Sequence, residues 1–132
     1  MTHATQMLET SPQQPMFDRE ALVRCIDACF DCAQSCEACA DACLAEDMVE
    51  ELTRCISLNA VCADVCATTG AALSRQRADD EQLLRTILET CARACKSCGD
   101  ECERHGDMHE HCRVCADACR VCEQSCREVL AQ

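Results

Sequence analysis

Cysteine residues recur at alternating steps of three and four along four stretches of the chain. Residues three and four apart lie on the same face of an α-helix, so each stretch predicts one helix with a continuous stripe of thiols. All eighteen cysteines of the 132-residue chain fall on these four stripes. They are Cys25, Cys29, Cys32, Cys36, Cys39 and Cys43; Cys55, Cys62 and Cys66; Cys91, Cys95, Cys98 and Cys102; and Cys112, Cys115, Cys119, Cys122 and Cys126.

The residues between the stripes indicate where the helices begin and end. From Asp18 onward there is no proline, and alanine, glutamate, arginine, glutamine and leucine predominate, which is a helix-forming composition. Asp47, Asp79 and Asp107 each precede a Glu or Gln by three residues, the spacing of a capping box at a helix start. We therefore predict helices near 18–44, 47–74, 79–105 and 107–130, with residues 1–17 as an N-terminal tail, flexible or a short helix.

Short connections between consecutive helices make neighbours antiparallel, so the predicted fold is all-α, an antiparallel four-helix bundle over residues 18–132 with a cysteine-lined core. Counting outward from the connections predicts layers across this bundle. One layer contains Cys36, Cys55, Cys98 and Cys115, the next contains Cys32, Asn59, Cys95 and Cys119, and one end is closed by Leu22, Thr69, Leu84 and Val129. Because a buried amide needs hydrogen-bond partners, we expect Asn59 to hydrogen-bond inside the core.

The apolar composition supports an interior made largely of cysteine. Trp and Tyr are absent and Phe occurs twice, and once cysteine and alanine are set aside only 27 large apolar side chains remain. A protonated thiol behaves as a small hydrophobic group, so cysteine can fill the space that larger residues would otherwise occupy.

Charge and targeting signals restrict the partners and the compartment. The 24 acidic and 12 basic residues give a net charge of −12, which disfavours nucleic acid as a partner. The N-terminal twenty residues lack an export signal, and we expect no membrane-spanning stretch. The predicted location is therefore cytoplasmic, where a large cysteine count indicates metal binding rather than disulfides.

The chemistry of the thiols points to copper. Cysteines four apart on a helix have β-carbons ~6 Å apart, too far for a disulfide but suited to a metal bridge. Eighteen buried thiolates would be too costly without compensation, so the metal-free thiols must be neutral. A monovalent ion that replaces each proton keeps the core neutral, and soft thiolates select Cu(I). We expect storage of multiple Cu(I) ions by all eighteen cysteines, without catalysis.

This pattern resembles the bacterial copper storage proteins, in their cytosolic branch, over roughly residues 18–130. The resemblance rests on the C-x-x-x-C series in all four helices. It implies a homotetramer of bundles and an open end at which His and Met residues admit copper. The residues predicted at that end are Met48, His105, Met108 and His109, whereas His111 is expected on the surface.

Two other functions remain open at this stage. Pairs such as Cys29 with Cys32, and Cys112 with Cys115, have the C-x-x-C spacing of iron–sulfur proteins, although ferredoxins place such pairs in loops. A zinc reservoir or thiol redox buffer is the second alternative. Both would use the same cysteines.

Overall fold

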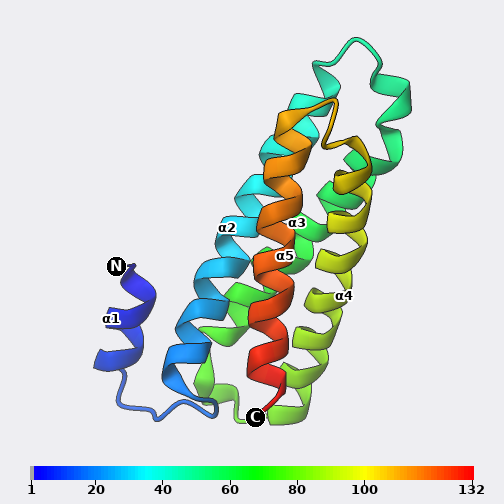
Figure 1. Ribbon diagram of the computed structural model, residues 1–132. Coiled ribbons are helices and arrows are strands. Elements are labelled where there is room, and N and C mark those ends of the chain that lie inside the picture. The colour runs from blue at the N-terminus through cyan, green and yellow to red at the C-terminus, as the bar shows by residue number, and fades with distance from the viewer. Residues whose placement is uncertain (1) are drawn as a thin grey trace.

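Four long antiparallel helices form the body of the molecule (Figure 1). The computed structural model describes residues 2–132, apart from the side chain of Ala78, and this part contains five α-helices, two 3₁₀ helices and no strand. In chain order these are α1 (His3–Thr10), α2 (Arg19–Leu44), η1 (Val49–Glu51), α3 (Thr53–Leu73), η2 (Gln76–Ala78), α4 (Glu81–His105) and α5 (Glu110–Leu130). The predicted all-α bundle with a cysteine-lined core is confirmed.

The two ends of the bundle differ in what closes them. At one end, named the mouth here, lie the α2–α3 and α4–α5 connections (Figure 1). At the opposite, closed end lie the α3–α4 connection and the C-terminus. Buried side chains seal the closed end: Leu22, Thr69, Leu73, Leu84, Leu88 and Val129. All four residues predicted to close this end, Leu22, Thr69, Leu84 and Val129, are buried.

Three predicted helix starts are wrong, and each error lies in a connection. The left-handed conformation of Asp79 (φ 55°) is unsuited to an N-cap, and Asp80 caps α4 instead by accepting a hydrogen bond from the Leu83 N–H at 3.0 Å. Asp47 lies in the α2–α3 connection and Asp107 in the α4–α5 connection, so neither residue begins a helix. As a result α3 begins only at Thr53, after η1, and α5 begins at Glu110.

The N-terminal tail contains a short helix that packs on the bundle. Leu8 of α1 and Phe17 are both buried and join the hydrophobic core. The Met16 N–H donates to Gln76 Oε1 at 3.0 Å, and the Asp18 N–H donates to Gln132 Oε1 at 2.7 Å. The tail is thus attached to the closed end. The division of the chain into a tail of residues 1–17 and a copper-binding domain of residues 18–132 stays a prediction.

The register agrees with the predicted layers among α2, α4 and α5, where Cys36, Cys98 and Cys115 lie in one group, whereas α3 is displaced. Across α2 and α5 the sulfurs of Cys32 and Cys119 lie 3.8 Å apart, as predicted. Across α3 and α4, Cys55 lies 3.6 Å from Cys102 instead of opposite Cys98, a shift of one stripe position. The α2–α3 connection spans eight residues, 45–52, and includes η1. Counting from a tight turn there therefore misplaces α3, and Asn59 instead of Cys55 contacts Cys98 and Cys115.

The expectation of no stretch long and apolar enough to span a membrane is wrong for α3. By length and composition it is the one described helix that could cross a membrane. Cysteine and alanine contribute much of this apolar character, and the cysteine face of α3 is buried in the bundle. In this fold α3 is a core helix.

The cap assignment predicts the effect of two substitutions at the start of α4. Asp80→Ala removes the acceptor for the Leu83 N–H and should lower the free energy of unfolding by ~1 kcal/mol. Asp79→Gly places glycine in a left-handed conformation that suits it, and should cause no loss. Urea denaturation of the metal-free, reduced protein measures both. A loss for Asp79→Gly together with none for Asp80→Ala would contradict the assignment.

Candidate metal centre

The core contains a closely spaced array of free thiols. Every cysteine is at most 2% exposed, and neighbouring Sγ atoms lie between 3.5 Å, for Cys66 and Cys95, and 4.0 Å, for Cys36 and Cys98. These separations are well beyond the ~2.05 Å of a disulfide bond. Two metal–thiolate bonds of ~2.3 Å can span up to ~4.6 Å, so a metal ion fits between neighbouring sulfurs.

The thiols form groups that share members along the bundle axis. In each group all four Sγ atoms lie within 4.8 Å of one another. Four of these groups are Cys29–Cys91–Cys122–Cys126, Cys32–Cys66–Cys95–Cys122, Cys32–Cys36–Cys62–Cys119 and Cys36–Cys98–Cys115–Cys119. Cys122 joins the first group to the second, and Cys32 joins the second to the third. A shared thiolate can bridge two metal ions, so the array suits polynuclear clusters better than isolated sites.

Asn59 is the polar side chain at the centre of this array. It is fully buried, and its Oδ1 accepts hydrogen bonds from the thiols of Cys98 at 3.0 Å and Cys115 at 3.1 Å. Its Nδ2 donates to the Sγ of Cys55 at 3.6 Å. The predicted hydrogen-bonding role of Asn59 is confirmed. The amide thus connects thiols of α3, α4 and α5 through hydrogen bonds.

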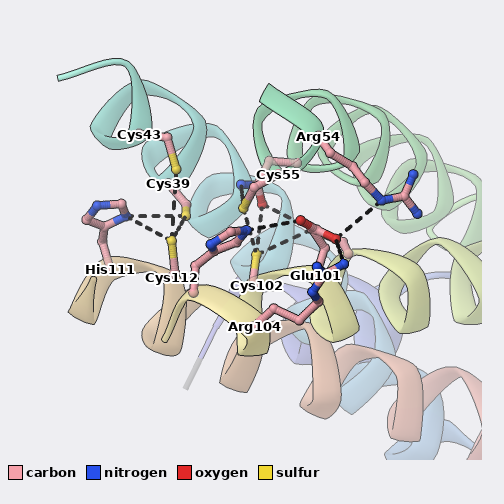
Figure 2. A network of polar contacts seen from close by, with 12 residues as sticks. Cys39, Cys43, Arg54, Cys55, Glu101, Cys102, Arg104, His111 and Cys112 are labelled. Carbon is pink, nitrogen blue, oxygen red and sulfur yellow. Dashed lines mark hydrogen bonds and ion pairs between the residues drawn. The ribbon is translucent and has the colours of Figure 1, made fainter. Parts of the chain in front are cut away.

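A mixed sulfur and nitrogen group lies at the mouth (Figure 2). Cys39 and Cys43 come from the last turns of α2, and His111 and Cys112 from the first turn of α5. The His111 Nδ1 lies 3.5 Å from the Sγ of Cys39 and 3.7 Å from that of Cys112. This mouth group shares no member with the four sulfur groups above. It supplies three soft sulfurs and one imidazole nitrogen, a suitable donor set for copper.

The thiols of the mouth group differ in acidity. Hydrogen bonding, first from Cys102, lowers the pKa of the Cys39 thiol to about 6. Burial, followed by the charge of Cys39, raises the pKa of Cys43 to about 11 and also raises that of Cys112. Cys39 is therefore the member that most readily becomes a thiolate, the form that binds metal.

Glu46, in the α2–α3 connection, contacts two histidines at once. Its Oε2 lies 2.8 Å from the His111 Nε2 and 3.0 Å from the His109 Nδ1. The two rings stack, with centroids 5.6 Å apart and planes at 24°. The hydrogen bond from His111 is the main reason that the pKa of Glu46 lies below its ordinary value. The carboxylate is thus ionised and acts only as an acceptor.

A second carboxylate at the mouth is almost fully buried. The side chain of Glu101 is 7% exposed and accepts hydrogen bonds from Arg54 at 3.3 Å and Arg104 at 3.4 Å (Figure 2). The His105 Nε2 lies 3.0 Å from its other oxygen. Two arginines and a histidine compensate this buried charge. His105 is therefore tied to Glu101 on α4.

The structure separates the residues predicted at the open end. Met48 and Met108 are exposed, at 48% and 72%, while His105 and His109 each contact a carboxylate. The expectation that His111 is a surface residue is wrong, because its Nδ1 faces Cys39. Steps of three and four along the chain select Cys112 for the buried stripe, and they therefore exclude its neighbour His111. A histidine at a helix start next to a stripe cysteine is the signal that could have identified it.

These observations define the class of protein. Its interior is a column of buried, free cysteines with sulfurs at metal-bridging distance, closed at one end by mainly aliphatic side chains. No lysine or arginine is buried in the part of the chain that the structure describes, so the core has no cation to balance thiolates. The molecule is a helical bundle whose core can exchange many protons for soft monovalent metal ions.

Comparisons with known proteins agree with this description. The family model described as copper storage protein matches residues 18–131. The copper storage protein Ccsp from Streptomyces lividans, loaded with ten copper equivalents, is 54% identical, with a TM-score of 0.95 over 97% of this chain and 98% of that one. A five-copper structure of a cytosolic copper storage protein from Streptomyces lividans is 57% identical, with a TM-score of 0.85 over 86% and 94% of the two chains.

More distant relatives come from Bacillus subtilis. The Cu(I)-bound copper storage protein BsCsp3 is 39% identical, with a TM-score of 0.71 over 80% of this chain and 94% of that one. An uncharacterized cysteine-rich protein of Bacillus subtilis, YhjQ, is 39% identical over 55% of this chain, and the match spans 64% of its own length. The chain belongs to the copper storage protein family.

The position of Asn59 predicts a measurable contribution to the stability of the metal-free protein. Asn59→Ala removes the acceptor for two buried thiols and leaves a cavity, and should lower the free energy of unfolding by ~1–3 kcal/mol. Asn59→Leu refills much of that volume without the hydrogen bonds. Urea denaturation under reducing conditions compares the variants. If Asn59→Ala is as stable as the parent, the predicted contribution of the amide is contradicted.

Proposed function

We propose that this chain stores and buffers multiple Cu(I) ions in the cytoplasm, with all eighteen cysteines as ligands. The observation that carries the proposal is the array of buried thiols whose sulfur groups share members along the axis. Membership of the copper storage protein family supports it, as does similarity to a Streptomyces protein described as cytosolic and to a Cu(I)-bound protein. Copper is the cargo of the bundle.

Charge balance favours Cu(I) over zinc in this core. A zinc ion held by four thiolates leaves two uncompensated negative charges, whereas Cu(I) taken up at about one ion per thiolate leaves none. The buried polar residues of the described chain are Asn59, Thr69, Gln76, Glu101 and Ser125, and none can carry a positive charge. The core is therefore suited to monovalent ions.

We propose that the protein is not an enzyme and has neither nucleic-acid nor membrane partners. Its thiols are at most 2% exposed, so no substrate larger than a metal ion reaches them without opening the bundle. The net charge of −12 opposes binding to phosphates. Copper is the proposed partner.

The mouth is the proposed route of loading. The mouth group lies there, and Cys39 is its most readily ionised member. The exposed thioethers of Met48 and Met108 lie on the two connections of the same end. Soft sulfur and imidazole ligands suit transient binding of Cu(I). We include Met48, His105, Met108 and His109 among the residues that copper meets there.

Anaerobic titration of the reduced protein with Cu(I), against a chromophoric chelator, tests storage directly. We expect uptake on the order of one ion per cysteine, because each neutral thiol exchanges one proton for one ion. The loaded protein should be colourless, which separates it from an iron–sulfur carrier. Tight binding of only one or two ions would contradict storage, and preferential retention of zinc in direct competition would favour the zinc reservoir.

We also propose a homotetramer. Val61 is 54% exposed on a face where α3 and α4 form a shallow groove lined in part by Leu58, Val65 and Ala94. Exposed aliphatic residues on such a face are typical of a subunit contact. Light scattering should give about four times the chain mass of 14.5 kDa, and Val61→Glu should lower the mass without loss of helix content. A mass of one chain for the parent protein would contradict the proposal.

A further inference from the structure

His111 contacts the mouth thiols on one side of its ring and Glu46 on the other, and these contacts indicate a role for Glu46. The imidazole lies between a carboxylate of the α2–α3 connection and the thiols of the mouth group. Its Nε2 faces Glu46 Oε2 at 2.8 Å, and its Nδ1 faces the sulfurs of Cys39 and Cys112. Figure 2 shows His111 directed toward these two cysteines.

The hydrogen-bond chemistry defines which ring nitrogen is free. An ionised carboxylate can only accept, so the Nε2 of His111 carries the hydrogen that it donates to Glu46. In the neutral ring Nδ1 then has the lone pair, and this nitrogen faces the Sγ of Cys39 at 3.5 Å. The nitrogen available to a metal therefore points toward the thiols, while rotation of the ring would break the contact with Glu46.

We propose that Glu46 is a positioning residue for copper capture: it holds His111 with Nδ1 directed at the mouth thiols. The inference rests on the proposed storage function and extends it to a residue that binds no copper itself. A carboxylate behind a metal-binding histidine fixes ring orientation and makes the nitrogen a better donor. Such partners typically contribute about 10–100-fold to metal affinity.

The second contact of Glu46 makes this support more rigid. The same oxygen accepts from the His109 Nδ1 at 3.0 Å, and the His109 ring stacks on that of His111. The carboxylate and the neighbouring ring thus restrain His111 from two directions. Glu46 lies in the α2–α3 connection and His111 at the start of α5, so the contact also links the two sides of the mouth.

The experiment compares three variants of the full chain in the reduced, metal-free form. Glu46→Ala removes the acceptor, Glu46→Gln keeps an acceptor oxygen without the charge, and Asp47→Ala removes a charge from the adjacent exposed residue. Chelator competition measures the affinity of the first Cu(I) ion, and saturation measures capacity. Long-range proton–nitrogen NMR correlations report which nitrogen of His111 carries hydrogen. Circular dichroism verifies that each variant keeps its helix content.

We expect Glu46→Ala to weaken first-ion binding about 10–100-fold while capacity is unchanged, because no thiol is lost. Glu46→Gln should retain most of the affinity, and Asp47→Ala should match the parent. In the parent, NMR should show hydrogen on the His111 Nε2 only, and Glu46→Ala should relax this preference.

Three results would overturn the proposal. The first is an unchanged affinity for the first Cu(I) ion in Glu46→Ala. The second is an equal loss of that affinity in Glu46→Ala and Asp47→Ala, which would indicate a general effect of charge. The third is hydrogen on the His111 Nδ1 of the parent protein. The proposed function fails separately. Storage is disproved if the parent protein takes up only one or two ions. If the parent has full capacity and Glu46→Ala binds the first ion as tightly as the parent, only the positioning role is disproved.

Discussion

Electrical neutrality of the buried thiols is the constraint on which the rest of the structure depends. Eighteen thiolates could not be buried together in a core without cations, so most sulfurs of the empty bundle must carry a proton. Each thiol can then hydrogen-bond weakly to its neighbours at 3.5–4.0 Å, and these separations also suit a bridging metal ion. Replacement of a proton by a monovalent ion leaves both the charge and the helix positions nearly unchanged. The fold can therefore accept cargo gradually instead of switching between two states.

The same constraint explains why polar chemistry is confined to one end. Ionised side chains can be buried only where partners compensate them, and at the mouth Glu101 has two arginines and a histidine while Glu46 has two histidines. The lowered pKa of Cys39 belongs to this polar region. Under the proposed loading route, Cu(I) ions exchange with thiol protons at the mouth, where charge is tolerated. At the closed end the buried side chains of the described residues are mainly aliphatic.

Much of the bundle could be predicted from the spacing of cysteines alone. Steps of three and four identify the helices and the buried face of each. The α2–α5 register follows because both stripes carry cysteine at every step, from the pair Cys25 and Cys126 to the pair Cys39 and Cys112. The connections were harder to predict. Capping motifs at Asp47, Asp79 and Asp107 look the same whether the chain begins a helix there or crosses to the next one, and tertiary packing decides. His111 was missed for a related reason, since its contact with Cys39 depends on how α5 begins.

Stabilisation of the fold and metal binding are assigned to different parts of the bundle along its axis. A small chain needs a packed apolar core to fold, but thiols pack like small side chains and contribute less than leucine would. The large buried residues are concentrated toward the closed end, where Leu22, Leu73, Leu84, Leu88 and Val129 lie, and Leu8 and Phe17 of the tail add to them. Folding of the empty protein can therefore rely on this end and on the helix contacts, while the middle of the core remains available for metal. Bound copper would then stabilise the region that contributes least to folding, since a ligand that binds only the native state raises its stability.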